Sequence, residues 1–479
     1  MIKRVLISFL LLMALKAAGQ DTHYWAANFS AGSFVMPGGV VANNRDSGVV
    51  FYNPALLAYS LKNSAAISGN LYQWQLINVK DGTGVNKDLR SVYANIIPVT
   101  GSGTLHLDVG KAFTIGYAFL HDPEINYQAN QQGNSDIDIP DLNNAPGKES
   151  FLGQYSVQNK SSYTSSLLSV GFKVSDKIAL GFTGEAGLRH YFFSGYYSAR
   201  AFRNNMRDNA LNYVATHEGY QADFFHLGMR FKAGMSYDDG SNHLGLVITT
   251  PLMRLYGNGT VLSDVELNNL RPSPTERPIN LLANARQTSM AATWKMPVSV
   301  ALGYARDFNN NKGQINFTTE YFKDVPFYNI LTPTKDYFAR GSNIASIYTP
   351  DQLKLTDARR AVINFGVGVS YLLKPNLTGY ASIRTDMSYA SDALNQGNTG
   401  YPYNTTNWNN IRWQLGTNVK KRKFNLRTGF MFAYGSTNNY KQSINFDTPT
   451  EQNILQGELL KTKASHFSMG LLFAYIYNF

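Results

Sequence analysis

The chain contains no cysteine, so it can form no disulfide bond, no thiolate metal site and no thiolate nucleophile. Charged residues are also scarce: Asp, Glu, Lys and Arg together make up 16% of the sequence, against about a quarter in soluble proteins. Beyond the first residues, no stretch approaches the roughly 18 consecutive apolar residues that indicate a membrane-spanning helix. These absences exclude a disulfide-stapled scaffold, a thiol enzyme and a helical membrane protein.

Aromatic residues, by contrast, are abundant. They make up 13% of the chain, with 30 Tyr and 28 Phe. Few charges and many aromatic rings suit a surface that faces lipid, with the rings at the level of the headgroups. The formal charge of +11 is scattered along the sequence rather than clustered. It therefore favours contact with lipid phosphates over nucleic-acid binding.

The N-terminus predicts a cleaved export signal. Lys3 and Arg4 form a basic start, an apolar stretch follows at residues 5–15, and small residues continue to Gly19. The apolar stretch is well short of the ~20 residues that a membrane anchor needs. We therefore expect residues 1–19 to be removed as a signal peptide, with cleavage near Gly19.

The last residues alternate with period two. From Phe467 to Phe479, every second residue is large and apolar, whereas most of the residues between them are small or polar. Period-two alternation is the signature of a β-strand. An amphipathic strand that ends on a Phe resembles the closing strand of outer-membrane barrels.

Similar two-sided strands recur along the chain, and we expect fourteen of them. They are predicted near residues 64–80, 90–108, 112–121, 162–174, 177–188, 221–237, 242–262, 286–307, 312–323, 360–373, 377–388, 408–420, 423–435 and 464–479. Short turns alternate with long polar loops, which are predicted at 122–161, 189–220, 263–285, 324–359, 389–407 and 436–463, with a shorter one at 81–89.

Tight turns at one end, long loops at the other and an even number of strands are typical of bacterial outer-membrane barrels. The predicted fold is therefore all-β: a transmembrane antiparallel β-barrel over residues 63–479. We expect it in the outer membrane of a Gram-negative bacterium, in contact with lipopolysaccharide and other outer-membrane lipid, with its long loops outside.

Residues 20–62 precede the first predicted strand and lack sustained alternation. Within them, Asn53, Pro54, Ala55 and Leu56 predict the start of a short helix. Asn can cap free backbone N–H groups, and Pro at the first helical position loses no hydrogen bond. A barrel of about fourteen strands has a lumen wider than its own side chains fill. We therefore expect this segment to fold inside the barrel as a plug rather than outside it.

These features resemble the FadL-type outer-membrane transporters. The stretch from Asn53 to Ala58 and the Gly- and Ala-rich residues before it are similar to the N-terminal hatch of that family, which carries an Asn-Pro-Ala motif before its first strand. Residues 294–304 are similar to the family's Pro-containing eighth strand. The resemblance implies fourteen strands behind a hatch. It also implies a lateral gap near the third strand, with pairing interrupted at Pro123.

The resemblance implies passive uptake of small hydrophobic molecules, such as long-chain fatty acids or aromatic hydrocarbons. A relative in the type IX secretion machinery instead uses its barrel as a docking or shuttle protein, so a secretion-system partner is the alternative. An apolar pocket continuous with the loops would favour uptake, whereas a lumen filled by polar hatch contacts would favour docking. The eight His residues show no catalytic or metal-ligand spacing, and no phosphate-binding loop occurs. We therefore expect no enzyme activity, no metal and no cofactor.

The predicted inner faces carry charges of both signs. They are Asp108, Glu185 and Glu320 against Arg189, Arg230, Lys232, Arg412 and Arg427. A salt-bridged, hydrated lumen that holds the hatch is the simpler interpretation. A sharper one is that Arg230, Arg412 or Arg427 meets the acidic head group of an elongated apolar ligand, because guanidinium can bind a carboxylate through two hydrogen bonds.

Overall fold

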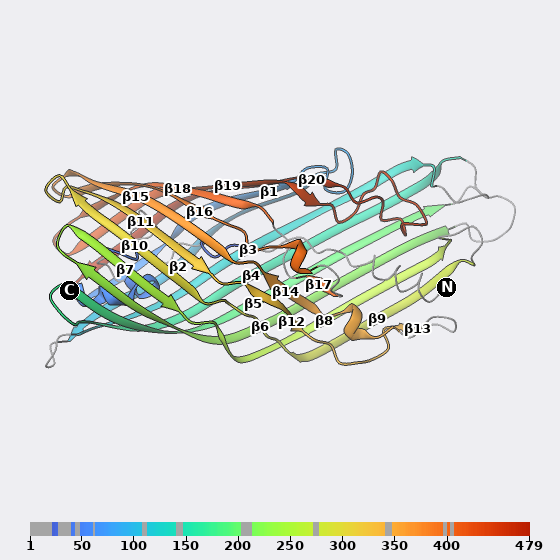
Figure 1. Cartoon of the computed structure of the whole chain (residues 1–479). Coiled ribbons are helices and arrows are strands. Elements are labelled where there is room, and N and C mark those ends of the chain that lie inside the picture. The colour runs from blue at the N-terminus through green and yellow to red at the C-terminus, as the bar shows by residue number, and fades with distance from the viewer. Residues whose placement is uncertain are drawn as a thin grey trace.

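Alternating large and small residues produce a β-sheet whose first and last strands pair with each other. The computed structural model describes residues 22–26, 40–43, 48–60, 63–107, 113–139, 147–202, 213–271, 277–340, 347–395, 400–402 and 407–479. The sheet closes into a long barrel with tilted strands (Figure 1). Among these residues, no helix is long and apolar enough to cross a membrane.

The barrel wall contains fourteen strands, as the sequence predicts. In chain order they are β1 (Ser64–Val79), β2 (Leu89–Leu107), β3 (Phe113–Ile137), β4 (Glu149–Lys173), β5 (Ile178–Phe202), β6 (Tyr213–Asp238), β7 (Asn242–Thr249) with β8 (Met253–Leu270), β9 (Ile279–Ala291) with β10 (Ser299–Phe308), β11 (Gly313–Phe322), β15 (Val362–Lys374), β16 (Leu377–Asp386), β18 (Asn409–Lys420), β19 (Phe424–Lys441) and β20 (Lys461–Asn478). Because β6 pairs with both β7 and β8, these two are halves of one wall strand. β9 and β10 are likewise halves of the next.

Side chains alternate across the wall as the predicted strands require. On β3, Tyr117 and Phe119 are exposed, whereas Ala118 and Leu120 are buried. Exposed Leu, Ile, Val, Phe and Tyr side chains recur on the outer face of nearly every wall strand. An outer face this apolar is suited to lipid and unsuited to water.

The predicted lengths of the loops were wrong on one side of the barrel. β3, β4 and β5 have 25 residues each and β6 has 26, whereas about 9–11 residues cross a bilayer. The expected loops 122–161, 189–220 and 263–285 therefore shrink to residues 138–148, 203–212 and 271–278. Beyond the apolar band, these strands carry polar residues on their outer face. In the sequence alone, such residues resemble those of a loop.

Two further predicted loops contain secondary structure that packs inside the tall strands. Segments β12 (Val325–Leu331), β14 (Leu355–Arg359) and β17 (Tyr401–Pro402) form a separate three-stranded sheet, which we name the loop sheet. The same regions hold β13 (Ala339–Arg340), α3 (Thr349–Gln352) and η2 (Asp392–Asn395).

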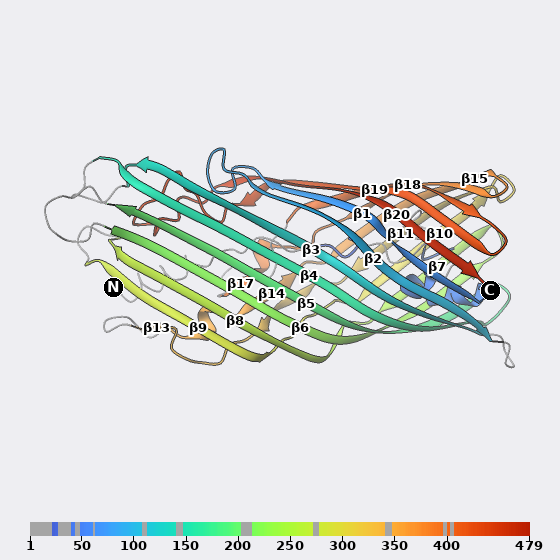
Figure 2. The ribbon, with the colours of Figure 1, turned by 180° about the vertical axis from the view of Figure 1, so that it is seen from behind.

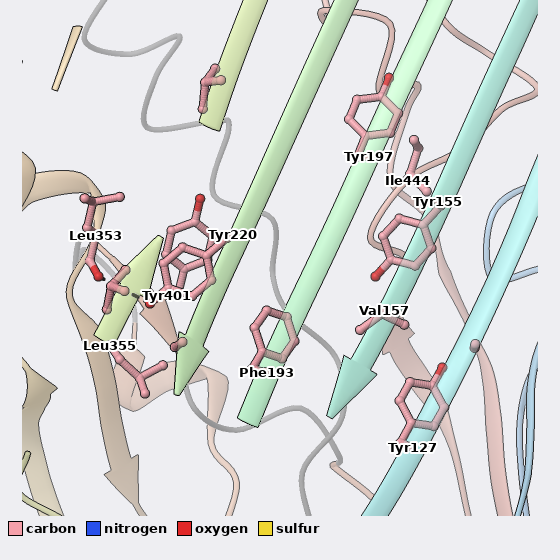
Figure 3. Close-up of a cluster of buried hydrophobic side chains, with 14 of the residues drawn as sticks. Tyr127, Tyr155, Val157, Phe193, Tyr197, Tyr220, Leu353, Leu355, Tyr401 and Ile444 are labelled. Atoms are coloured by element: carbon pink, nitrogen blue, oxygen red, sulfur yellow. Dashed lines mark hydrogen bonds between the residues drawn. The ribbon is translucent and has the colours of Figure 1, made fainter. Parts of the chain in front are cut away.

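The loop sheet shares the largest hydrophobic core of the molecule with the inner faces of β3 to β6. The rings of Tyr220 on β6 and Tyr401 on β17 stack with centroids 3.5 Å apart. Figure 3 shows this cluster, with Tyr127, Tyr155 and Tyr197 following one another across the neighbouring strands. A packed core therefore fills the lumen at the end where the long connections lie.

Two short helices lie at the other end. α2 (Val49–Tyr52) and η1 (Pro54–Tyr59) are almost wholly buried. They lie within the outline of the barrel, near the C-terminus and the short turns, in both views (Figures 1 and 2). The lumen is thus occupied from both ends, and the space between is where a ligand could bind.

Candidate functional site

A cavity of about 160 Å³ lies in the lumen between the N-terminal helices and the loop sheet. Its apolar lining comes from both the wall and the N-terminal residues: Tyr24, Val40, Val41, Phe51, Leu120, Val247, Trp294, Met296, Ala301 and Phe322. Its charged lining comprises Asp122, Glu124, Glu185, Arg189, Arg230, Lys232, Glu320, Arg359 and Arg384. This mixture fits an amphipathic ligand better than a purely polar one.

On the short-turn side of the cavity, the Asn53 side chain joins separate segments through hydrogen bonds. Its side-chain oxygen accepts a hydrogen bond from the Ala55 N–H at 3.1 Å, and Pro54 occupies the first position of η1, so the predicted cap is present. Its side-chain nitrogen donates to the carbonyl oxygens of Val41 at 2.8 Å and Met235 at 3.2 Å. The residue thus ties η1 to another N-terminal piece and to the wall.

Inward-facing glycines let the helix backbone approach the strands. A Cβ atom added at Gly181 on β5 would lie 2.3 Å from the Pro54 carbonyl carbon. A Cβ atom at Gly234 on β6 would lie 2.2 Å from the Asn53 side-chain oxygen. Neither position has room for a side chain while η1 is in place, so these glycines are complementary to the Asn-Pro-Ala segment.

The described residues nearest the N-terminus contact the opposite wall. Trp25 donates its indole N–H to Glu320 Oε2 at 2.7 Å and its backbone N–H to Asp386 Oδ1 at 3.0 Å. The Tyr24 ring stacks on Phe322 with centroids 4.2 Å apart. Aromatic side chains from this segment therefore form part of the cavity wall.

On the β5–β6 side of the cavity, the Glu185 carboxylate binds the basic side chains of Arg230 and Lys232. Arg230 donates two hydrogen bonds of 2.8 Å to its carboxylate, and Lys232 Nζ lies 3.3 Å from Oε2. Tyr163 donates to the same carboxylate at 2.9 Å, and Lys232 Nζ also donates to the Phe51 carbonyl oxygen at 2.7 Å. Arg230 therefore lines the cavity but is already held by Glu185.

Three other side chains that line the cavity carry N–H groups without a hydrogen-bond partner among the described residues. Arg359 donates through Nε to Asp357 Oδ2 at 2.8 Å, but its Nη1 and Nη2 have no hydrogen-bond partner among the described residues. The same is true of Nε and Nη2 of Arg384 and of the Trp294 indole N–H. All three side chains are buried, at 0%, 5% and 3% exposed respectively.

Leaving a buried donor unpaired costs about 1–3 kcal/mol, and more where the donor is charged. Five unpaired donors around one cavity therefore create a site for an acceptor-rich group. Burial opposes the charge on Arg359, but Asp357 and the neighbouring tyrosine side chains keep its pKa well above the ordinary value. Burial also raises the pKa of the Tyr24 hydroxyl beside it. The site thus presents a permanent cation next to a neutral phenol.

Trp294 reaches the cavity because the eighth wall strand is broken. The ladder of β9 ends at Ala291, and that of β10 begins at Ser299. The intervening residues leave the wall, and the guanidinium groups of Arg189 and Arg359 lie over the Trp294 ring, 3.6 Å and 5.0 Å from its centroid. Cation–π contacts of this kind hold two arginines that would otherwise repel each other.

A second irregularity lies where β2 meets β3, on the side of the wall seen in Figure 2. These strands pair from Leu107↔Phe113 to Thr100↔Leu120, and no further pairs follow. β2 nevertheless continues to pair with β1 as far as Leu89. β3 has a register shift against β4 between Asp122 and Ile125, which spans Pro123. The predicted interruption of pairing at Pro123 is therefore confirmed.

The unpaired part of the β2–β3 seam borders the cavity. Leu120, the last paired residue of β3, and the next acidic residues, Asp122 and Glu124, all line the cavity. Beyond that point β2 and β3 are joined through side chains: the Gln128 N–H donates to Ser91 Oγ at 3.0 Å, and Gln131 Nε2 donates to the Asp88 carbonyl oxygen at 3.2 Å. Such bonds separate more easily than a ladder of backbone pairs.

The structure distributes the predicted arginines unevenly. Arg230 lines the cavity, whereas Arg412 donates to Asp386 at 2.9 Å and lies outside the lining. Arg427 shares the inward phase of Met431 and Ala433 but also lies outside the lining. Asp108 falls outside the described residues.

Sequence analysis missed Arg359 and Arg384. The first lies in a predicted loop, and no local pattern indicates that the loop folds inward. The second shares the inner face of β16 with Asp386, so alternation could have identified it. In the described parts of the chain, no group of three or more His, Asp or Glu residues is arranged to hold a metal ion.

Known proteins add information on the fold. No protein-family model matches the sequence, and no curated protein sequence matches it significantly. Among solved structures, a FadL homologue from Pseudomonas aeruginosa aligns over 97% of this chain and 100% of its own, with a TM-score of 0.52 and 14% identity. The chain has the fold of the FadL-type transporters.

Two further structures with the FadL-type fold align equally well. The Ralstonia pickettii toluene transporter TbuX aligns over 95% of this chain and 99% of its own, with a TM-score of 0.52 and 12% identity. The toluene transporter TodX of P. putida aligns over 96% and 99%, with a TM-score of 0.52 and 11% identity. At such low identity the likeness extends to architecture and not to individual ligand contacts.

Proposed function

We propose that this protein is an outer-membrane channel for the passive uptake of small hydrophobic molecules. The observation that carries the proposal is the partly apolar cavity inside a closed barrel, bordered by a seam where the wall is unpaired. The apolar outer face supports a location in the membrane. The structures with the same fold are described as a FadL homologue and as toluene transporters, which supports the substrate class and argues against enzyme activity.

Residues 20–62 act in this proposal as a hatch, after removal of residues 1–19. In the described parts of the segment, η1 is buried against the inner faces of β4, β5 and β6, and α2 against β3 and β4. Asn53, Pro54, Ala55 and Leu56 anchor the hatch because they contact the wall directly. A molecule in the cavity would leave through the β2–β3 seam or past the hatch.

The ligand carries an acidic or otherwise acceptor-rich head group, bound by Arg359 and Arg384. We place it there rather than at Arg412 or Arg427, which lie outside the cavity lining, while Arg230 remains a neighbouring contact. Arg384 and Arg412 are direct cross-strand partners, and Asp386 is already occupied by Arg412 and Trp25. An anion beside Arg384 would offset this like-charge contact.

An apolar tail in the rest of the cavity would gain about 0.8 kcal/mol per buried CH₂ group, so no energy source is needed to extract it from water. The docking alternative gains no support, because the lumen keeps a cavity instead of being filled by polar contacts.

The test is uptake and binding of a labelled long-chain fatty acid. We expect Arg359→Met together with Arg384→Met to lower the affinity of the purified protein about 10- to 100-fold, the effect of losing charge-assisted hydrogen bonds. Arg422→Met, on an exposed turn, is the control and should bind normally. Failure of the wild type to bind either the fatty acid or toluene would overturn the proposed function. Equal binding by the double variant would overturn only the head-group assignment.

A further inference from the structure

The short-turn end of the barrel carries a concentrated positive charge on one side. Three consecutive turns around the rim, β10–β11, β15–β16 and β18–β19, hold six basic residues. These residues, which we name the basic rim, are Lys312, Lys374, Lys420, Lys421, Arg422 and Lys423. The neighbouring β6–β7 turn carries Asp238 and Asp239 instead, and the β4–β5 turn carries Lys173 and Lys177 with Asp176. Among the described turns of this end, the positive charge is therefore densest at the basic rim.

Every side chain of the basic rim is exposed, and none forms an ion pair within the described part of the chain. The three hairpins that hold these turns carry Asp307, Glu320 and Asp386, and the last two lie at the far ends of β11 and β16. Asp307 lies 3.2 Å from His243 and accepts a hydrogen bond from Gln314. Within the described residues, the positive charge of the rim is therefore not neutralised by the protein itself.

The basic rim begins where the apolar outer surface ends. Leu373, at 58% exposed, immediately precedes Lys374, and Phe424 immediately follows Lys423. Phe308 and Tyr371, on the neighbouring strands, are also exposed. Rings and aliphatic side chains at this level mark the boundary between the acyl chains and the headgroups. Lysine and arginine side chains one or two residues further can extend to the phosphates.

We propose that the basic rim binds anionic phospholipid headgroups in the periplasmic leaflet, which fixes the depth and tilt of this side of the barrel. The inference rests on the membrane location in the proposed function, but not on the identity of the transported molecule. A lipid fits better than an acidic protein because the charges follow a curved edge beside an apolar belt.

The experiment compares lipids that remain bound to the purified full-length protein. The barrel is reconstituted into vesicles of equal phosphatidylethanolamine and phosphatidylglycerol and extracted in mild detergent, and its lipid adducts are counted by native mass spectrometry. We expect the wild type to retain phosphatidylglycerol preferentially, less so as salt is raised. The variant K420Q/K421Q/R422Q/K423Q should show a preference about tenfold weaker, because each basic group near the surface contributes to binding.

A variant with the same charge change at the other end is the control. Substitutions K160Q, R200Q, K461Q and K463Q neutralise four exposed basic residues on the loop side and should leave the preference intact. Equal phosphatidylglycerol retention by the wild type and the rim variant would overturn the proposal, as would an equal loss in the control. Folding is checked by the gel shift of the unheated barrel, and fatty-acid uptake in the same vesicles separately tests the proposed function.

Discussion

At the scale of single residues, the chemistry of the cavity depends on which inward-facing charged side chains form ion pairs within the protein. Arg230 and Arg412 both point inward, as their strand phase predicts, and each is held by a carboxylate, Glu185 or Asp386. Arg384 points inward by the same rule, but its neighbouring carboxylate is already used by Arg412. Alternation along the sequence predicts the face of a residue. It cannot predict which arginine keeps free N–H groups, because that depends on pairing across strands.

The inward glycines give a residue-scale prediction. Gly181→Ala should displace η1, because the added Cβ would meet the Pro54 backbone at 2.3–2.5 Å. Overpacking of this kind costs about 1–3 kcal/mol. The substitution is made in a background that carries Ala58→Cys, which gives the chain its single thiol. We expect maleimide to label this thiol faster in the Gly181→Ala variant than in the parent, while the unheated barrel keeps its mobility on a gel.

Gly184→Ala is the matched control, since its Cβ would point to the outer face with no atom closer than 3.7 Å. Labelling should then proceed at the parent rate. Equal labelling in both variants would show that η1 does not depend on contact with β5.

At the scale of the elements, pairing between strands was more predictable than their length. The order of all fourteen wall strands and the interruption at Pro123 follow from alternation and resemblance. The extension of β3 to Ile137 does not follow from them. After the register shift, the large residues of this strand, such as Tyr127, face inward and its polar residues face water. The sequence pattern of such a strand is inverted relative to the lipid-facing part.

The unpaired seam carries an element-scale prediction. Ser91→Cys and Gln128→Cys lie across the seam, where the Gln128 backbone N–H donates to Ser91 Oγ at 3.0 Å, and should form a disulfide or accept a short thiol crosslinker. The natural chain has no cysteine to interfere. We expect oxidation to reduce fatty-acid uptake severalfold and reduction to restore it, because the seam can then open.

The control bridges two strands that are fully paired. Gln158→Cys and Ser194→Cys are direct partners on β4 and β5. Their oxidation should leave uptake unchanged. Inhibition by both crosslinks would indicate general stiffening of the wall. Inhibition by neither would indicate that the ligand leaves past the hatch and not through the seam.

At the scale of the whole molecule, the barrel is closed by two different structures. The short-turn end is occupied by α2 and η1, which contact the wall through backbone groups and glycines. The loop end is filled by the loop sheet and its hydrophobic core. Sequence analysis predicted the start of η1 at Asn53 and Pro54 from a motif of four residues. It missed the second because the loop sheet is stabilised by partners more than a hundred residues away, such as Tyr220 for Tyr401.

Under the proposed function, this arrangement makes the loop sheet the barrier between the outer medium and the cavity. Tyr401 stacks on Tyr220 and donates a hydrogen bond of 2.8 Å to Glu218. Tyr401→Ala removes both contacts, and truncating a buried aromatic side chain costs about 3–5 kcal/mol. The wall should remain folded, because its strands pair with one another. We expect the loop end to become more sensitive to protease and fatty-acid uptake to rise, since the ligand must displace this core to reach the cavity.

Tyr434→Ala is the control, because that ring is 46% exposed on the outer face of β19 and touches neither the loop sheet nor the cavity lining. Protease sensitivity and uptake should both stay at the wild-type level. If Tyr401→Ala opens the loop end to protease but leaves uptake unchanged, ligand does not pass through the loop sheet. The unpaired β2–β3 seam would then be the way in as well as the way out, and hydrophobic molecules would reach the cavity from within the membrane.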